Sequence, residues 1–478
     1  MKTGSKKKIL LIHPLGDNWM PGQTDMSRIA NILPPIGLLS LTSWLEKHGH
    51  QVELHDCYAH PGREDRIDEV LRTESPEFAG FSTTTSSFPD AARIARRIKA
   101  AHPRVKTVFG GVHISALREG LMRQFPEVDY GVVGEGEEPF RALIESNGEG
   151  PGAIPGLLHR DGEEVRFNGL QQHKLELDDL PFPAYGKLEG FPKTYTLPIF
   201  NYPKAPGTTA VTSRGCPYTC SYCDRSVFGR SFRHNSPEYM VELFRHVRDD
   251  FGVRHVNFYD DNFAVNKRRV EDFCEQMTAA RLGMSFNLAT RSDHILDEHL
   301  PLLKRAGCWM ISMGIETGNA ELLGEHRSRA DLELIRQKVR AIRAAGIRVK
   351  GLFIMGLPGE TERTIDQSID FALNLGLNDL NLTKFTPFPG SPLYEKVREQ
   401  GEFDETWERM NCLNFVFIPK GFTRERLEER YREFYRRYYQ RLSVMLGYVS
   451  MIWRSPNSWL RFLENLKDFL SIRRAYKS

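Results

Sequence analysis

Three cysteines with tight spacing stand near the middle of the chain, at Cys216, Cys220 and Cys223. The spacing is C-x3-C-x2-C, and no partnering fourth cysteine lies nearby. Three thiolates on one short loop can converge on one metal centre. A zinc site would need a fourth ligand to close its tetrahedron, whereas an iron–sulfur cluster can leave one iron open for another ligand. The residues therefore predict a metal centre.

The cysteine loop follows a β-branched run at residues 208–212, which predicts a strand that breaks at Gly215. Strand and loop together resemble the radical S-adenosylmethionine (SAM) superfamily, whose members often place an aromatic residue where Tyr222 stands. The resemblance implies a [4Fe-4S] cluster on the three cysteines, SAM chelated by the open iron, and Tyr222 near the adenine. It also implies reductive cleavage of SAM to a 5′-deoxyadenosyl radical, with electrons from a donor of the flavodoxin or ferredoxin class.

Residues 208–392 repeat strand and helix. Further strands are expected at residues 255–259, 285–289, 309–313, 348–355 and 379–385. With the first strand they make six β/α units, which matches the partial barrel of the superfamily. Functional residues of such barrels lie where strands end, and those ends carry the next set of candidates.

Each barrel candidate has a functional and a plainer interpretation. Glu316 is predicted to hold the SAM amino group or ribose hydroxyls, and is otherwise a surface carboxylate. Arg291 is predicted to bind the methionine carboxylate, and is otherwise part of a salt bridge inside the barrel. Gly356 would let the backbone approach the adenine, or simply make a turn. Asp260 and Asp261 would contact SAM or a cation, or remain solvated.

The N-terminal part alternates strands and helices at a shorter pitch. Strands are expected at residues 9–13, 51–54, 78–82, 106–109 and 130–133, with helices at 36–47, 90–100 and 137–145. This order predicts a doubly wound parallel sheet that binds its ligand at the carboxyl ends of the strands. Those ends read PLGDNW at 14–19, STTTSS at 82–87, GGVH at 110–113 and GEGE at 134–137.

Taken singly, each of these loops is ordinary turn chemistry. In this order they resemble the cobalamin-binding domain that precedes many radical SAM enzymes. The resemblance implies cobalamin contacts at Ser82, Thr84, Gly110, Gly111, His113, Gly134, Glu135 and Gly136. The D-x-H-x-x-G signature is absent, because Asp56, His60 and Gly62 have the wrong spacing. Cobalamin is therefore expected without a histidine on cobalt, as in the group resembling anaerobic Mg-protoporphyrin ester cyclase. His113 is expected to hydrogen-bond the cofactor or to be structural, with ligation of cobalt as the sharper alternative.

The fold expected is α/β: a Rossmann-like cobalamin-binding domain (1–146), a connector (147–207), a partial (β/α)6 radical SAM barrel (208–392) and a helical C-terminal region (393–478). The connector should contain a hairpin that turns near residues 161–162. Hydrophobic content of 40% and charged content of 27% are ordinary for a soluble globular protein. The remaining cysteines are expected to be buried rather than paired, which indicates a reducing, cytoplasmic compartment: Cys57, Cys274, Cys308 and Cys412.

The basic residues gather at the end of the chain. Residues 424–478 hold thirteen Lys/Arg and six Asp/Glu. From residue 423 a helical pattern places Leu427, Tyr431, Phe434, Tyr435, Tyr438 and Leu442 on one face. The tail is interpreted as a membrane-surface element, a helical cap on the barrel, or both, with these aromatic residues at the lipid interface: Trp453, Trp459, Phe462 and Phe469. Nucleic-acid binding is disfavoured, since no recognition fold accompanies the basic residues.

The resemblance implies a cobalamin-dependent radical SAM methyltransferase acting on an unactivated carbon. The layout and the basic, aromatic tail are most like the hopanoid methylases, in particular the hopanoid C-3 methylase, so a lipophilic small molecule is the expected substrate. One alternative is an enzyme with the same cofactors that closes a ring on a tetrapyrrole ester. A cobalamin- or redox-sensing regulator and an RNA methylthiotransferase are further alternatives. RNA methylthiotransferases usually have three additional N-terminal cysteines, whereas the N-terminal region of this chain has only Cys57, which counts against that alternative.

Overall fold

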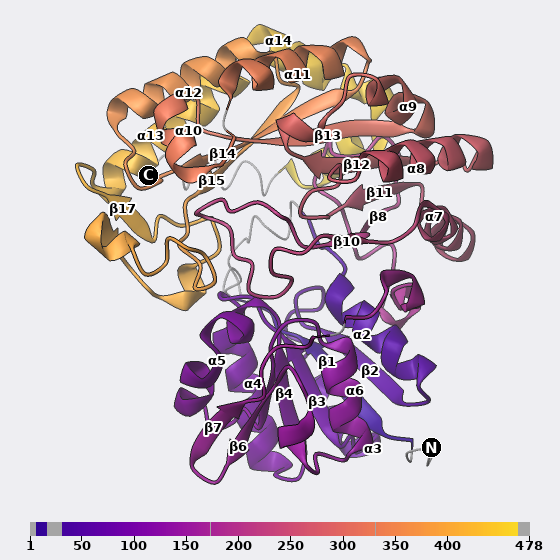
Figure 1. Ribbon diagram of the computed structural model, residues 1–478. Helices are drawn as coiled ribbons and strands as arrows, with labels where there is room; N and C mark the ends of the chain where they lie inside the picture. Colours follow the sequence, from indigo (N-terminus) through magenta and orange to yellow (C-terminus); the bar gives the residue numbers. More distant parts are fainter. Residues whose placement is uncertain (1–5, 17–30, 173, 330, 467–478) are drawn as a thin grey trace.

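The computed structural model describes residues 6–16, 31–172, 174–329 and 331–466. Figure 1 shows two α/β units, one above the other, with the N-terminal unit (indigo to magenta) below and the second unit (red to yellow) above. The predicted α/β class and the order of the units are confirmed by this arrangement. Each unit is built on its own sheet.

The N-terminal sheet has seven strands in the order β2-β1-β3-β4-β5-β6-β7. The strands are β1 (Lys8–His13), β2 (Gln51–Asp56), β3 (Phe78–Ser82), β4 (Lys106–Gly110), β5 (Tyr130–Val132), β6 (Leu157–Asp161) and β7 (Glu164–Phe167). The first five pair in parallel, and the predicted β6–β7 hairpin adds antiparallel to β5. The N-terminal sheet therefore extends into the segment interpreted as a connector.

Helices cover both faces of this sheet, as Figure 1 shows. They are α2 (Ile36–Lys47), α3 (Asp65–Thr73), α4 (Phe88–Ala101), α5 (Val112–Gln124) and α6 (Glu137–Glu145). Strand β1 is buried on both faces, with Leu10 and Leu11 fully inaccessible, as expected of a strand covered by helices on both sides. Two helices were not predicted: α3 is short and mostly charged, and α5 contains a kink at Arg118, where φ is +49°.

The second sheet has six parallel strands in the order β15-β14-β13-β12-β11-β8, which confirms the partial barrel. The strands are β8 (Gly207–Ala210), β11 (His255–Phe258), β12 (Ser285–Thr290), β13 (Cys308–Glu316), β14 (Arg348–Met355) and β15 (Asp379–Lys384). The helices are α7 (Pro237–Phe251), α8 (Lys267–Ala280), α9 (His299–Ala306), α10 (Ala320–His326), α11 (Leu332–Ala344) and α12 (Glu362–Leu375). A two-stranded ladder, β9 (Ser213–Arg214) with β10 (Arg233–His234), flanks the cysteine loop.

The C-terminal region closes the barrel. A small unpredicted hairpin, β16 (Gly401–Phe403) with β17 (Phe417–Pro419), precedes the helices α13 (Arg424–Tyr439), α14 (Leu442–Val449), α15 (Met451–Arg454) and α16 (Pro456–Glu464). Helix α13 packs on the barrel: the Phe434 ring lies 5.4 Å from Phe353, and the Tyr438 hydroxyl donates to the Leu377 carbonyl. The helix ends at Tyr439, so Leu442 does not continue its apolar face and is 70% exposed.

Candidate active site

The three cysteines line one cavity of about 410 Å³ between the two units. Ser82, Thr84 and Gly111, from the carboxyl ends of β3 and β4, line the same cavity. The structure thus brings together residues predicted for two different cofactors. This is the geometry expected where both sheets present their carboxyl edges to each other.

The three cysteines are the metal-ligating candidates of this cavity, and they line it together. Iron–sulfur clusters are held by cysteine thiolates. A donor set of three thiols from one loop therefore fits a [4Fe-4S] cluster.

Positive charge lies beside the cysteine loop. The Arg291 guanidinium donates to the Cys220 sulfur, with 3.7 Å between Nη1 and Sγ. A hydrogen bond from the Cys223 thiol, and then the Arg291 charge, lower the pKa of the Cys220 thiol, while burial opposes them. Thiolate is the form that binds iron, and the Arg291 charge favours that form at Cys220. Burial raises the pKa of the Cys216 thiol, and the hydrogen bond to Cys220 together with burial raises that of Cys223.

Arg291 is only partly available to a substrate carboxylate. Its Nε and Nη2 donate to the two Asp293 oxygens at 2.9 and 3.1 Å, and Nη2 also donates to the Ser328 carbonyl. Its guanidinium lies 3.9 Å from the centre of the Tyr218 ring. The barrel salt bridge that sequence analysis gave as the alternative is therefore present, and the methionine-carboxylate contact stays a prediction.

Glu316 lies within β13 rather than after it. The pairing of β13 with β14 shifts register between Gly314 and Glu316, and Glu316 has φ of +66°. Such bulges aim a side chain away from the regular pleat. Its Oε1 lies 3.7 Å from Arg327 Nη1, and burial raises the pKa of its carboxyl to about 6 despite that charge. A largely buried carboxylate with one distant cation can accept hydrogen bonds from an ammonium group or hydroxyls, as predicted for SAM.

Gly356 directly follows β14 and has φ of +90°, a conformation that favours glycine. A Cβ there would lie 3.2 Å from the Phe415 ring. Its N–H donates to the carboxyl of Glu360, a residue that sequence analysis did not single out. Burial raises the pKa of Glu360 to about 8, so this carboxyl is protonated at neutral pH and holds the turn.

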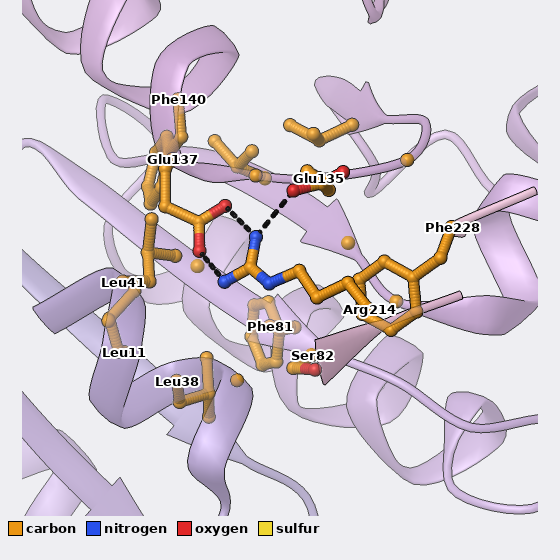
Figure 2. A pocket seen from close by; sticks show the side chains of 18 residues that line it. Leu11, Leu38, Leu41, Phe81, Ser82, Glu135, Glu137, Phe140, Arg214 and Phe228 are labelled. Atoms are coloured by element: carbon orange, nitrogen blue, oxygen red, sulfur yellow. Dashed lines mark hydrogen bonds and ion pairs between the residues drawn. The ribbon is translucent and has the colours of Figure 1, made fainter. Parts of the chain in front are cut away.

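A second, narrower cavity of about 140 Å³ runs along the N-terminal sheet (Figure 2). Its lining includes six of the eight cobalamin candidates: Ser82, Gly110, Gly111, Gly134, Glu135 and Gly136. Leu11, Leu38 and Phe140 form apolar walls. At Gly136 an added Cβ would meet no atom within 4 Å, so this lining position has open space beside it. We call this glycine-lined cavity the slot beside the larger cavity.

Arg214 joins the two units across this slot (Figure 2). Its Nη1 lies 2.6 Å from Glu135 Oε2, and its Nη2 lies 2.6 Å from Glu137 Oε1. All three side chains are at most 13% exposed. Arg233 also donates to Glu135. The carboxylate of Glu135, which sequence analysis gave to cobalamin, is thus bonded to residues beside the cysteine loop.

His113 does not reach either cavity. It is fully buried, its ring lies 4.8 Å from Phe88 and 4.5 Å from Trp407, and its Nδ1 pairs with Thr85 Oγ1 at 3.3 Å. Burial lowers the pKa of its imidazole to about 3, which keeps it neutral. These surroundings favour the structural role for His113, and a contact of His113 with cobalamin stays a prediction.

Some of the remaining candidate residues are buried in the protein, and others line the larger cavity. Asp260 is buried and accepts hydrogen bonds from the Thr212 amide and hydroxyl at 2.6 and 2.9 Å, so it anchors the end of β8. Asp261 lines the larger cavity. Tyr222 is half-buried within the barrel, beside the Leu357 cluster of apolar residues. Three of the four other cysteines are buried as predicted, and Cys412 is half-buried; all four are free.

Comparison with known families matches both units of the fold. A model described as the B12 binding domain matches residues 22–144, and a model of the radical SAM superfamily matches residues 210–372. The chain is a cobalamin-dependent radical SAM enzyme. Its cofactors are a [4Fe-4S] cluster, SAM and cobalamin.

Full-length relatives support this assignment. The chain is 28% identical over 430 residues to an uncharacterized methyltransferase of Pyrococcus horikoshii, covering 88% of this chain and 90% of that protein. It is 26% identical to the anaerobic magnesium-protoporphyrin IX monomethyl ester cyclase of Rubrivivax gelatinosus, over 88% of this chain and 75% of that protein. It is 25% identical to the hopanoid C-2 methylase of Rhodopseudomonas palustris, over 82% and 69%. The hopanoid relative is thus a C-2 methylase, where the sequence predicted C-3.

A solved structure shares the fold. The radical SAM methyltransferase TsrM from Kitasatospora setae, with cobalamin and a [4Fe-4S] cluster bound, superposes with a TM-score of 0.66 at 19% identity. The match covers 82% of this chain and 75% of that chain. The relationship extends over both sheets, so it shows that the two units of this chain are arranged as one known architecture.

The residues present fit these cofactors. Cys216, Cys220 and Cys223 would hold the cluster, and the glycine-lined slot would take part of cobalamin. Glu316 and Gly356, two of the residues predicted for SAM, line neither of these two cavities. When bound, the cofactors supply hydrogen abstraction from carbon and methyl transfer. The chain itself polarises the cluster loop through Arg291, keeps a buried acceptor at Glu316, and encloses the cavity between two sheets.

Proposed function

We propose that this enzyme moves the methyl group of SAM to an unactivated carbon of a lipophilic substrate. The observation that carries the proposal is the single cavity shared by the cysteine loop and by Ser82, Thr84 and Gly111. Radical formation and methyl delivery must reach the same substrate carbon, and holding reactants together supplies a large part of catalysis. A wall that includes Ile36, Val112 and Phe228 favours an apolar substrate.

The proposed reaction consumes two molecules of SAM and two electrons for each substrate carbon. One SAM loses its methyl group and becomes S-adenosylhomocysteine. The other gives methionine and 5′-deoxyadenosine, which carries away the substrate hydrogen. The two electrons neutralise the two sulfonium charges, and we assign their supply to a low-potential donor of the flavodoxin or ferredoxin class.

For the substrate we propose the hopanoid class. The support is the relationship to a hopanoid C-2 methylase and the basic, aromatic C-terminal region. The ring carbon is part of the test, because the sequence layout favours C-3 whereas the named relative modifies C-2. The second candidate is ring closure on a tetrapyrrole ester, favoured by the 26% identity to the cyclase of Rubrivivax gelatinosus.

The experiment is an anaerobic incubation of protein reconstituted with iron, sulfide and hydroxocobalamin. SAM, dithionite and a lipid extract containing desmethyl hopanoids are added, and nucleosides and lipids are measured by mass spectrometry. We expect 5′-deoxyadenosine, S-adenosylhomocysteine and a lipid that has gained one methylene unit, with the fragment ions giving the ring position. Formation of 5′-deoxyadenosine without S-adenosylhomocysteine, in incubations with lipid or with a porphyrin ester, would contradict methyl transfer. It would favour the cyclase reaction or another oxidation.

A further inference from the structure

The outer surface of α14–α16 is unusually apolar. Eight large hydrophobic side chains on these helices are 43–78% exposed: Leu442, Met445, Leu446, Val449, Ile452, Trp453, Leu460 and Leu463. Elsewhere in the described part of the chain only Leu170, Tyr259 and Leu413 are comparably exposed. We call these eight side chains the C-terminal apolar face. Large apolar side chains exposed together on consecutive helices are the kind of surface that marks an interaction site.

The apolar face belongs to a folded, anchored element. On α14 the exposed residues recur at the spacing of one helix face, and the opposite face is turned inward. Val444 and Met451 are buried, and the Tyr448 hydroxyl donates to Asp379 at 2.8 Å. Helix α14 therefore packs on the barrel with one face and exposes its apolar residues on the other.

The aromatic residues predicted for a lipid interface divide into two groups. The Trp459 and Phe462 rings pack against Phe200, at 5.5 and 6.3 Å, and so belong to the attachment of α16 to the protein. Trp453 is 78% exposed and lies on the C-terminal apolar face. Phe469 lies outside the described residues.

Cations flank this face. Residues 436–466 contain five arginines and one glutamate. Arg441 caps the start of α14 and Arg454 ends α15, and neither has a carboxylate partner within 4 Å in the described part of the chain. By contrast, Arg426 and Arg430 on α13 are paired with Glu362. Arg441 and Arg454, two basic groups without a carboxylate partner beside an apolar surface, complement a layer of anionic headgroups above hydrocarbon.

We propose that the C-terminal apolar face docks on the surface of an anionic lipid bilayer. Leu446 and Trp453 enter the boundary between headgroups and acyl chains, and Arg441 and Arg454 lie against the phosphates. No described helix is long and apolar enough to cross the membrane, so the contact is peripheral. The inference goes beyond methyl transfer, because it concerns where the enzyme works rather than which bond it makes.

The test is flotation of the full-length protein with vesicles of phosphatidylcholine, with and without phosphatidylglycerol. We expect the protein to float with the anionic vesicles at low salt, and to bind at least about tenfold less when salt is raised, because screening weakens the arginine contacts. The paired variant Leu446→Glu/Trp453→Glu should lose at least about tenfold in binding. Leu170→Glu, at a side chain 58% exposed in the N-terminal unit, is the matched control and should bind like wild type.

Depth is measured separately with brominated lipids, which quench tryptophan near the acyl chains. Quenching should be strong in wild type and fall in Trp453→Phe, a variant that keeps the apolar surface and should still float. The proposal is overturned if wild type ignores anionic vesicles, or if Leu446→Glu/Trp453→Glu binds them as well as wild type. It is also overturned if the wild type forms dimers that this paired variant does not, since the face would then be the interface with a second copy.

Discussion

Replacing Arg214 by methionine tests whether the ion pairs across the slot hold the two units together. Arg214 contacts Glu135 and Glu137 at 2.6 Å each, and its side chain is 13% exposed. In Arg214→Met, Glu135 keeps its ion pairs with Arg233 and with Lys174, the latter at 3.3 Å. Glu137 keeps only the Ser40 hydroxyl, at 3.2 Å, among the described residues. The uncompensated charge in the variant is therefore that of Glu137.

Removing one partner of a buried ion pair costs about 3–5 kcal/mol, because a buried charge is left without compensation. We expect the lower part of this range for Arg214→Met, since Glu135 is still paired. At a slope of about 2–3 kcal/mol per M of urea, the midpoint should fall by about 1–2 M. The double variant Arg214→Met/Glu137→Gln should recover at least half of the loss, because the amide carries no charge.

The assay is urea denaturation of cofactor-free, reduced protein followed by circular dichroism. Arg166→Met is the matched control, because that arginine is 58% exposed and pairs with exposed carboxylates. Surface pairs contribute about 0–1 kcal/mol, so this midpoint should hardly move. A shift in Arg214→Met no larger than that of the control, or a double variant no more stable than the single one, would refute the reasoning.

Three further predictions concern the cofactor sites. Cys220→Ala should lose cluster iron and 5′-deoxyadenosine formation, whereas Cys274→Ala, at a buried cysteine that lines neither cavity, should keep both. The free energy of unfolding should depend less on pH in Glu360→Gln than in the wild type. Burial raises the pKa of this carboxyl from 4.5 to about 8, so the folded protein holds a proton that the unfolded chain releases. Wild-type stability should therefore fall as pH rises from about 4.5 to 8. Unfolding free energies at several pH values check this, and parallel profiles would contradict it. Gly136→Leu should weaken cobalamin binding at least about tenfold in absorbance titrations, because the leucine would fill the slot. The control Gly120→Leu, at an exposed glycine with no atom near its Cβ, should change the affinity less than about twofold. Equal affinities of Gly136→Leu and the wild type would show that the slot is not part of the cobalamin site.

Local patterns predicted much of the fold. Helices α2 and α6 begin and end at the residues expected from their apolar spacing. The short apolar runs before STTTSS, GGVH and GEGE are strands, and β8 leads into the cysteine loop. These features depend on neighbours in sequence, so periodicity and turn residues are enough to find them.

Partners distant along the chain could not be predicted in the same way. His113 appeared available in the GGVH loop, but Trp407 packs against it from the C-terminal region. Glu135 was predicted to contact cobalamin, but in the folded protein its carboxylate pairs with Arg214 across the slot. Glu316 was placed after its strand because the bulge in β13 leaves no trace in the hydrophobic pattern. One signal was present for Arg214, which stands two residues before Cys216, but its acidic partners come from the other sheet.

The most direct test of the central claim uses SAM with a trideuterated methyl group in the reconstituted reaction. If both cofactors serve one substrate in the shared cavity, the product carries the intact trideuterated methyl group, and 5′-deoxyadenosine and S-adenosylhomocysteine form in equal amounts. If instead 5′-deoxyadenosine accumulates while all deuterium stays in methionine and unreacted SAM, the enzyme does not transfer methyl groups, and the proposed function is contradicted.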